Sequence, residues 1–514
     1  MKKIATIFII AAGLFSCTGN FEEINTNPNV ATNVSAYGMF EPLLYDGGKD
    51  WQNYTWFWND ELIQFTAFTG GTTREEHRYI ISVGNWASVW NLYMRRANDA
   101  QHMYELAVEQ NDPALQAIAL TFKVYIMSNL TDWFGDIPYA EAFMGAKPGG
   151  TITPVFDSQK DVYLLMFADL EKANDLYGMT PAPVFLQVSM DGMYGGQMKG
   201  WQKFNNSLYM RLLCRVSGRS EMNAGAKMTE IIGNPEKYPI FESNADNATI
   251  HYAGTTPYVN YFYNTPHGEF TGSGRKITEQ VIKMTLREDE LGNQTVVDPR
   301  LPVIAQPATA GGRWKGTISG VPRQYAGDAN SGSSQLNTPV FCRPTAPTFI
   351  MDFAELQFIL AEAALKGYIS GGEARAQEYY TAAVIASLEK WAEFGQYSET
   401  PVTIGPLETG AFLESEFASW ELAENKEQLI ADQKYLALFW VGMEAYHEYR
   451  RTGYPVLTIG AGTVANDYIL PTRFGYNNVT MGTNPNATIA VNRMGGNDMK
   501  TPVWWSKQAI ESGR

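Results

Sequence analysis

Residues 353–394 read FAELQFILAEAALKGYISGGEARAQEYYTAAVIASLEKWAEF, two apolar-periodic stretches separated by a glycine pair. Apolar residues recur every three or four positions in both stretches, which is the spacing of amphipathic helices. Gly371 and Gly372 mark a turn between the two. Small residues would let the helices approach closely: Ala361, Ala363, Ala364, Ala382 and Ala383. The stretch therefore predicts a helical hairpin of the tetratricopeptide type.

The same helical periodicity occurs elsewhere in the chain, strongest in residues 86–110, 113–131, 160–177 and 426–451. No strict 34-residue period repeats along the sequence, so a regular solenoid is not expected. The pattern predicts a mainly α fold built from a few irregular, tetratricopeptide-like helical pairs.

Long tracts rich in Gly, Pro, Asn and Thr separate the helices, at residues 178–200, 233–275, 292–348 and 454–503. Tracts of this length are uncommon in compact domains unless they are functional or disordered. Disordered chains are poor in aromatic residues, whereas these tracts contain Tyr258, Tyr261, Phe262, Tyr263, Trp314, Tyr325, Trp504 and Trp505. We therefore expect a single domain over residues 36–514, with a large, ordered, loop-rich face that binds ligand.

The chain begins MKKIATIFIIAAGLFSC, in which Lys2 and Lys3 precede an apolar run that ends before Cys17. That run is too short to span a bilayer, which needs about 20 apolar residues, so residues 1–16 are predicted to be a signal peptide. Leu14 and Ser16 resemble a lipobox, which predicts lipidation of Cys17 and attachment to a membrane. Residues 17–35 are then a polar, lipidated tether.

Charge and cysteine content narrow the functional classes. The chain has 39 basic and 54 acidic residues, a net charge of −15, which argues against nucleic acid as a partner. With Cys17 lipidated, only Cys214 and Cys342 remain, and two such distant cysteines do not form a disulfide framework. Both are expected to be free thiols.

Two motifs resemble cofactor-binding sites, but the sequence around each argues against that role. Residues 458–467, TIGAGTVAND, fit the G-x-G-x-x-A spacing of dinucleotide sites, but the following Asn, Asp and Pro residues leave no room for the helix such a site requires. Glu444-x-x-His447 is a single copy, whereas a di-metal site needs two. We expect no cofactor, although a structural calcium ion held by loop oxygens stays open.

Aromatic residues supply the candidate binding site. Trp51, Tyr54, Trp58, Leu62 and Phe65 fall on one helical stripe, which is typical of a core-facing surface. Aromatics in polar, glycine-rich loops suit sugars instead, because sugar rings have apolar C–H faces and hydroxyl rims. The candidate ligand contacts are Trp314 and Trp86 as stacking platforms, with Tyr263, Tyr325 and Arg74 as hydrogen-bond donors.

Several stretches in order resemble the SusD-like (RagB/SusD) family of outer-membrane nutrient-binding lipoproteins. They are the lipidation signal with FEEINTNPN, WASVWNLYMRRAND (86–99), LTDWFGDIPYAEAF (130–143), DPRLPV (298–303), FAELQFILAEAALKG (353–367), LIADQKYLALFWVGMEAYHEYRRTGYP (429–455), and the closing ILPTRFGYNN and TNPN. The resemblance implies a helical scaffold carrying a loop-built glycan site. It also implies a SusC-like TonB-dependent transporter as partner and no catalysis.

The leading hypothesis is thus a lipid-anchored receptor, exposed on the outer membrane, that captures oligosaccharides and delivers them to that transporter. Phe21, Glu22 and Glu23 favour surface exposure, because they resemble the export signal of surface lipoproteins from Bacteroidota-type bacteria. Two alternatives remain: a surface glycoside hydrolase that uses an unidentified carboxylate pair, and a scaffold that binds only proteins.

Overall fold

The computed structural model describes residues 35–68, 74–179, 190–264, 274–308 and 312–513 of the chain. The predicted signal peptide, the lipidation site Cys17 and nearly all of the tether lie outside the described residues. Helices dominate what is described, so the mainly α prediction is confirmed.

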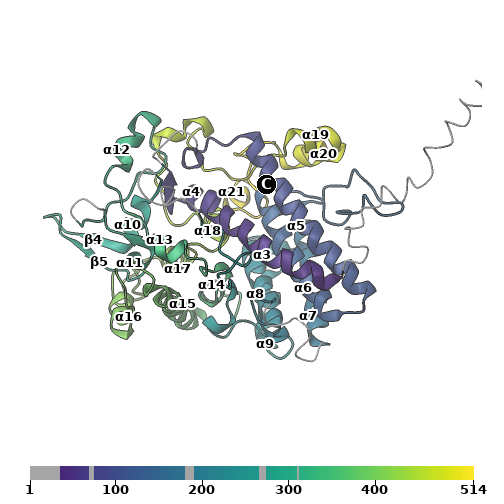
Figure 1. Cartoon of the computed structure of the whole chain (residues 1–514), viewed down its shortest axis with the longest axis horizontal. Helices are drawn as coiled ribbons and strands as arrows, with labels where there is room; N and C mark the ends of the chain where they lie inside the picture. The colour runs from purple at the N-terminus through teal and green to yellow at the C-terminus, as the bar shows by residue number, and fades with distance from the viewer. Residues whose placement is uncertain (1–34, 69–73, 180–189, 265–273, 309–311, 514) are drawn as a thin grey trace, which may run out of the picture.

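The longer helices form the scaffold (Figure 1). They are α3 (Ala36–Tyr54), α5 (Val83–Glu109), α6 (Pro113–Phe134), α7 (Gln159–Gly178), α8 (Met198–Val216), α9 (Ala224–Gly233), α14 (Phe353–Leu365), α15 (Gly372–Gly395), α16 (Pro406–Leu413), α17 (Lys426–Ala437), α18 (Glu444–Thr452) and α20 (Pro485–Met494).

Short elements fill the tracts that the sequence marks as loop-rich. The short helices are η1 (Thr55–Asn59), α4 (Asp60–Leu62), η2 (Glu76–Arg78), η3 (Ser220–Met222), η4 (Asn244–Asp246), α10 (Glu279–Thr285), α11 (Leu301–Ile304), η6 (Arg323–Tyr325), α12 (Ala326–Asn330), α13 (Thr338–Phe341), η7 (Ala461–Asn466), α19 (Asn478–Thr483) and α21 (Lys507–Glu511). The strands are β1 (Thr66–Phe68), β2 (Ala248–Ile250), β3 (Arg275–Ile277), β4 (Leu286–Glu288), β5 (Gln294–Val296), β6 (Ala305–Gln306), β7 (Gln335–Leu336) and β8 (Thr348–Met351).

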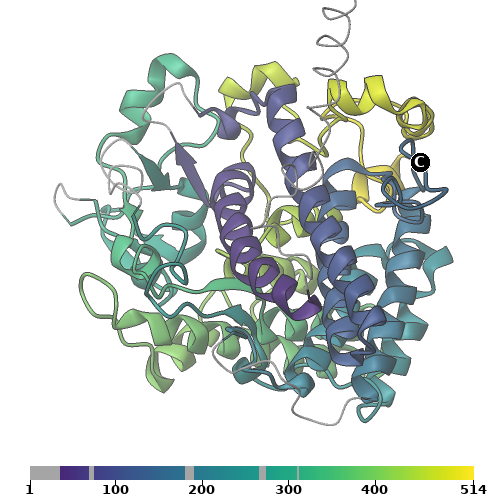
Figure 2. The same ribbon diagram turned by 45° about the vertical axis from the view of Figure 1, so that its right-hand side comes forward.

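Helices α5 to α8 stand side by side on one flank of the molecule (Figure 2). Helix α6 lies at their centre and is buried along nearly its whole length, which explains why its sequence is apolar on all sides. Its start is fixed by Asp112, whose side chain accepts a hydrogen bond from the Leu115 amide at 3.0 Å, and by Pro113 in the first turn. Helices α5, α7 and α8 pack against this central helix.

The helical hairpin predicted from residues 353–394 is confirmed. Helices α14 and α15 pack against each other more extensively than any other pair of elements in the described structure. Ala361, Ala364 and Ala383 are buried in the hairpin, as close approach of two helices requires. Gly371 and Gly372 have φ values of 113° and 59°, conformations that favour glycine.

The single helix predicted over residues 426–451 is wrong, because the segment is broken between α17 and α18. Trp440 and Gly442 have φ values of 67° and 51°, and this left-handed backbone cannot continue an α-helix. Trp440 is 3% exposed, with its ring 4.6 Å from that of Phe341. The apolar run through the break is continuous, so periodicity alone could not reveal it.

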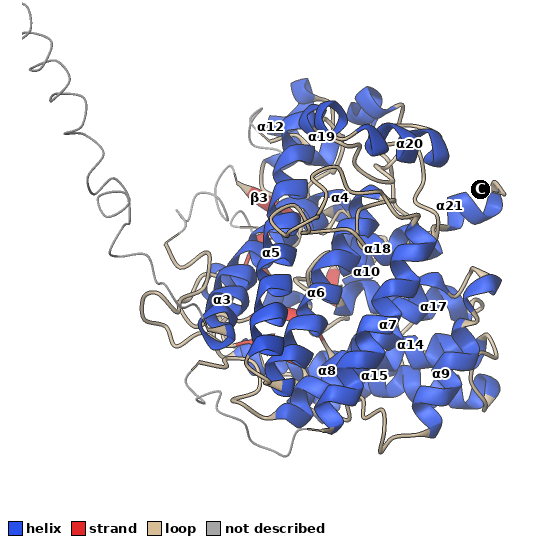
Figure 3. Ribbon diagram, turned by 90° about the vertical axis from the view of Figure 1, so that its right-hand side faces the viewer, coloured by secondary structure: helices blue, strands red, loops and turns tan. Residues whose placement is uncertain are grey.

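The strands form small sheets between the helices. The largest has the antiparallel order β1-β3-β7-β6, and β1 pairs with β3 so that Phe68 lies opposite Arg275. Helices α12, α19 and α20 lie along one edge of the molecule, with α15 toward the opposite edge, as Figures 1 and 3 both show.

No helix among the described residues combines the length and apolarity needed to cross a membrane. Cys214 and Cys342 are both free, as predicted. Burial raises the pKa of each thiol to about 12, so neither is a ready nucleophile at neutral pH.

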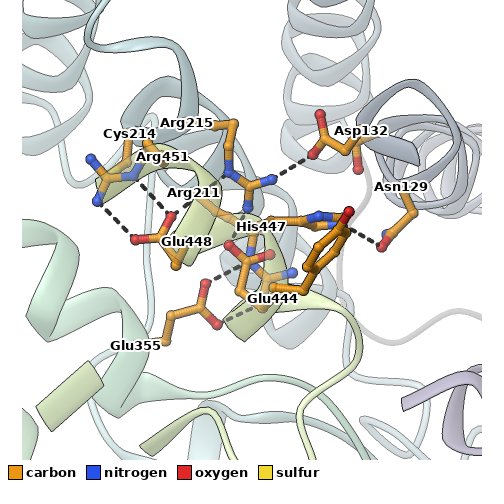
Figure 4. A network of polar contacts seen from close by, with 12 residues as sticks. Asn129, Asp132, Arg211, Cys214, Arg215, Glu355, Glu444, His447, Glu448 and Arg451 are labelled. Carbon is orange, nitrogen blue, oxygen red and sulfur yellow. Dashed lines mark hydrogen bonds and ion pairs between the residues drawn. The ribbon is translucent and has the colours of Figure 1, made fainter. Parts of the chain in front are cut away.

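A buried ionic network ties α6, α8, α14, α17 and α18 together (Figure 4). At its centre, the Arg215 guanidinium is 1% exposed and forms ion pairs with Asp132 of α6 and Glu444 of α18. Arg211, one turn earlier on α8, donates from Nε to Glu355 at 2.6 Å. Arg211 and Arg215 of α8 therefore have a structural role.

The network continues along α18 toward α14. Glu448 accepts from Lys434 Nζ at 2.7 Å and from Arg451 at 2.8 Å, and Arg451 also binds Glu362. Burial alone would raise the pKa of Glu362, but the Arg451 guanidinium outweighs burial and lowers that pKa to about 2. His447, beside Glu444, contacts Asn129 and Arg450, so the Glu-x-x-His pair belongs to this network.

Replacing Arg215 tests how much the network stabilises the fold. In Arg215→Ala, Asp132 and Glu444 lose their shared partner inside the protein, and we expect the free energy of unfolding to fall by about 3–5 kcal/mol. The matched control is Arg287→Ala, which breaks the exposed pair with Glu416 and is expected to cost under about 1 kcal/mol. Urea unfolding followed by circular dichroism measures both; equal losses would contradict the structural role.

Candidate functional site

A π-helical turn, η1, follows α3 and carries the sequence TWFWN. Trp56 and Trp58 are buried there, while Phe57 between them is half-buried. A π-helix is rare and occurs most often near functional sites. The turn shifts the helix register, and within it the Phe57 ring meets that of Trp58 edge to face at 4.8 Å.

Two arginines stack on the aromatic rings of this turn. Arg275 from β3 is fully buried, with its guanidinium 3.7 Å from the centroid of the Trp56 ring. Arg74 lies 5.0 Å from Trp56 and 5.2 Å from Phe57, within the range of cation–π attraction. Arg74 is half-buried, so the rings hold its guanidinium in place near the surface.

Carboxyl groups lie beneath these arginines. Glu61 pairs with Arg275 Nε at 2.6 Å and also accepts from the Phe68 amide. Burial raises the pKa of Asp60 to about 8 and that of Glu76 to about 7. All three residues are 6% exposed or less, so their carboxyl groups are largely inaccessible to a ligand in solvent.

The segment that carries Arg74 is fastened to the segment that carries Tyr325. Glu75 forms an ion pair with Arg323 at 2.6 Å. The Gly320 amide donates to His77 Nδ1 at 3.0 Å, and Arg78 Nε donates to the Val321 carbonyl at 2.6 Å. Tyr325, which ends η6, is 56% exposed. Two of the predicted site residues thus come from adjoining segments.

Glycines make this junction possible. Gly462 donates to the Gly320 carbonyl at 2.7 Å, so η7 packs directly on the 320–323 segment. A Cβ atom at position 462 would lie 2.6 Å from the Val321 carbonyl oxygen, closer than real side chains approach. The glycines of TIGAGTVAND therefore serve backbone packing in place of the phosphate contact that the motif suggests.

Tyr263 joins the same region through its neighbour. Phe262 is buried and meets Trp56 edge to face at 5.2 Å. Tyr263 follows it and is half-buried, while Tyr261 on the other side is 42% exposed. We use the term aromatic–arginine surface for Phe57, Arg74, Tyr261, Tyr263 and Tyr325.

The two predicted stacking platforms lie in other surroundings. Trp86, half-buried on α5, stacks on Phe474 with centroids 6.4 Å apart, and Phe474 in turn packs on Trp58. Trp314 is 9% exposed, so little of its ring is open for a sugar to stack on. It lines a separate cavity of about 460 Å³ beside the β4–β5 hairpin, together with Arg313 and Lys315.

Sequence reasoning missed Phe57, Tyr261 and Arg275 as site residues. The core stripe drew attention to Trp51 and Trp58, and Phe57 lies off that stripe. A cluster of aromatics alternating with polar residues was the available signal, since YVNYFYN contains Tyr261. No feature of the sequence identifies Arg275, because only the pairing of β1 with β3 brings it to Trp56.

Within the described residues, no group of three or more His, Cys, Asp or Glu side chains is arranged to hold a metal ion.

Comparisons with known proteins agree on one family. The sequence model of SusD-like proteins, described as "Starch-binding associating with outer membrane", matches residues 28–477. A solved SusD homologue from Bacteroides fragilis NCTC 9343 is 26% identical and has a TM-score of 0.76, covering 92% of this chain and 100% of its own. Among curated proteins, none matches the chain significantly.

Two further solved structures bind chitin according to their descriptions. One, a chitin-binding protein, is 25% identical with a TM-score of 0.74, over 92% of this chain and 100% of that one. The other, a chitin-binding SusD homologue from Flavobacterium johnsoniae, is 21% identical with a TM-score of 0.73, over 91% and 98%. The second likeness is evidence of shared fold alone.

The raised pKa of Asp60 predicts a specific pH dependence. A carboxyl whose pKa rises on folding favours the native state at low pH, and this contribution is lost as pH rises from about 4 toward about 8. Asp60→Asn removes the titration, so we expect the variant to gain stability relative to the parent across that window. Urea midpoints at pH 5, 6, 7 and 8 test this, with exposed Asp328→Asn as control; parallel profiles for parent and Asp60→Asn would contradict it.

Proposed function

The chain belongs to the SusD-like family of outer-membrane proteins, and we propose that it captures glycans at the cell surface and delivers them to a SusC-like TonB-dependent transporter. It acts in this proposal as a receptor without catalytic activity. The family match over residues 28–477 and the 26% identical homologue of the same fold support glycan binding.

The observation that carries the proposal is the aromatic–arginine surface. Tyr261 and Tyr325 are 42% and 56% exposed, and the half-buried Arg74 stacks beside the half-buried Phe57. Sugar rings need such a combination, because their C–H faces stack on aromatics and their hydroxyls bond to polar groups. A shallow surface of this kind buries few ligand atoms, so weak binding is expected, with Kd between about 1 μM and 1 mM. Weak binding favours release to a transporter.

Membrane attachment in this proposal comes from Cys17. Ser35 caps α3, because its side chain accepts a hydrogen bond from the Gly38 amide at 3.1 Å. The folded domain therefore begins directly after the tether. The tether of residues 17–35 would link the domain to the lipid anchor in the membrane.

The hydrolase alternative requires a pair of accessible carboxyl groups across a sugar bond. At the aromatic–arginine surface, the carboxyls of Asp60, Glu61 and Glu76 are buried, and Glu61 is paired with Arg275. The arrangement supports binding over hydrolysis at this place. The protein-scaffold alternative predicts no small ligand at all, which the following titration distinguishes.

We expect Tyr325→Ala to weaken glycan binding by about 3- to 10-fold, the loss of roughly 1 kcal/mol of ring contact. Residues 18–514 are titrated with starch- and chitin-derived oligosaccharides by calorimetry, and the same mixtures are analysed for cleavage products. Tyr397→Ala serves as control, since Tyr397 is also exposed, at 40%, but lies outside the aromatic–arginine surface.

Each outcome of the titration discriminates between the hypotheses. Saturable binding without products that Tyr325→Ala weakens supports the receptor. Cleavage products would move the protein to the hydrolases, and no binding across a broad panel would favour the scaffold. Binding unaffected by Tyr325→Ala would remove Tyr325 from the site.

Lipidation is tested independently through Cys17→Ala in the full-length chain. We expect the parent to incorporate radiolabelled palmitate and to sediment with outer membranes, because two or more acyl chains anchor a protein stably. The variant is expected to lose the label and remain unprocessed. A labelled variant, or an unlabelled parent, would contradict lipidation at this cysteine.

A further inference from the structure

An ion pair, which we call the η2–η6 ion pair, joins the segments of two proposed ligand contacts, Arg74 and Tyr325. Glu75 follows Arg74 directly in the chain, and Arg323 lies two residues before Tyr325 in η6. The Glu75 carboxylate accepts from Arg323 Nε at 2.6 Å and from its Nη2 at 2.7 Å, so both of its oxygens are engaged. This two-point geometry fixes direction as well as distance.

The two partners of the η2–η6 ion pair differ in exposure. The Glu75 side chain is 6% exposed, whereas that of Arg323 is 57% exposed. Ion pairs between two exposed side chains contribute little, because both side chains must be ordered and water screens them. Here one partner is already ordered, since Arg78, 1% exposed, donates from Nη1 to the same Glu75 Oε1 at 3.3 Å. Arg323 therefore meets an acceptor that is fixed in place.

The other contacts described across this junction lie inside the protein. The Gly320 amide donates to His77 Nδ1, and Arg78 Nε donates to the Val321 carbonyl. Burial lowers the pKa of His77 to about 3, so its ring is neutral near pH 7. Dissolved salt screens buried contacts much less than exposed ones. The η2–η6 ion pair is thus the salt-sensitive part of the described junction.

Tyr325 lies on a short stretch of chain between two anchors. One is Val321, whose carbonyl is bound from η2, and the other is Ala329 of α12, whose carbonyl accepts from Thr317 Oγ1 at 3.2 Å. Arg323 lies between these anchors and connects the stretch to η2. The Tyr325 side chain is 56% exposed, so packing covers less than half of it. Its position therefore depends on what holds the stretch in place.

We propose that Arg323 is a positioning residue for glycan binding, because its ion pair with Glu75 holds Tyr325 in a fixed position relative to Arg74. The inference rests on the proposed function, since it concerns the same aromatic–arginine surface. It adds a consequence that the ligand contacts alone do not predict. A neutral oligosaccharide binds more weakly as salt rises, because salt weakens the ion pair that aligns its contacts.

The test titrates residues 18–514 with maltoheptaose and with chitohexaose, both neutral, by calorimetry at low and at high NaCl. Between about 20 mM and about 500 mM NaCl, we expect the Kd of the parent to rise about 2- to 3-fold. Arg323→Gln is expected to weaken binding about 3- to 5-fold at low salt and to remove the salt dependence. Glu75 keeps Arg78 as its partner in this variant, so no buried charge is left unpaired.

Two further variants separate positioning from a general effect of charge. Arg323→Lys retains the charge but not the two-point geometry, so we expect intermediate affinity with the salt dependence retained. Arg287→Gln is the matched control, because Arg287 is 55% exposed and pairs with Glu416 outside the aromatic–arginine surface. It is expected to bind and to respond to salt like the parent.

Hydrogen exchange provides a readout that needs no ligand. The amides of residues 321–329 are expected to exchange faster in Arg323→Gln than in the parent, and faster in the parent at high salt, because the stretch has lost its connection to η2. The exchange of α14 and α15 is expected to be the same in both proteins, since the hairpin does not depend on this ion pair.

The proposal is overturned if Arg323→Gln and the parent show the same Kd and the same exchange over residues 321–329. A parent whose affinity does not respond to salt also overturns it, because any loss in Arg323→Gln then reflects direct contact of Arg323 with the sugar. If the parent binds no glycan, the proposed function fails, and hydrogen exchange alone decides whether the ion pair holds the stretch.

Discussion

The two ion pairs of Arg215 are the constraint on which the scaffold depends. A buried guanidinium is tolerated only when carboxylates neutralise it in good geometry, and its partners here come from α6 near the front of the chain and α18 near the end. The three helices must therefore keep one mutual orientation. Helix α18 in turn holds the π-helical turn, because the Tyr446 amide donates to Asn59 Oδ1 at 3.0 Å, so the position of the candidate site depends on the charge network.

The sequence predicted the parts of the fold that local periodicity controls. The α14–α15 hairpin, α6 and α7 appear where apolar spacing and turn glycines indicate them. The break between α17 and α18 was beyond such reasoning, because Trp440 adopts a left-handed backbone to fill a space among aromatics contributed by distant segments. The ionic network was equally hidden, since its members are ordinary helix residues until tertiary packing brings them together.

The site was predictable to a smaller degree. Arg74 and Tyr325 were selected for their loop context, and the structure places their segments in contact through Glu75 and Arg323. Trp314 was selected by the same argument, yet its ring is largely covered. A residue's composition context indicates whether it lies in a loop. It does not indicate which side of the loop faces solvent. Nor does it reveal that Arg275 of β3 stacks on Trp56, which depends on the pairing of β1 with β3.

The backbone contact between Gly320 and Gly462 has a consequence for how this protein diversifies. Two loops that touch without intervening side chains tolerate neither substitution nor a change of length at the contact. Positions beyond the contact, such as the exposed Tyr325, are free of that restriction. The glycine junction thus makes two loops move and vary as one unit.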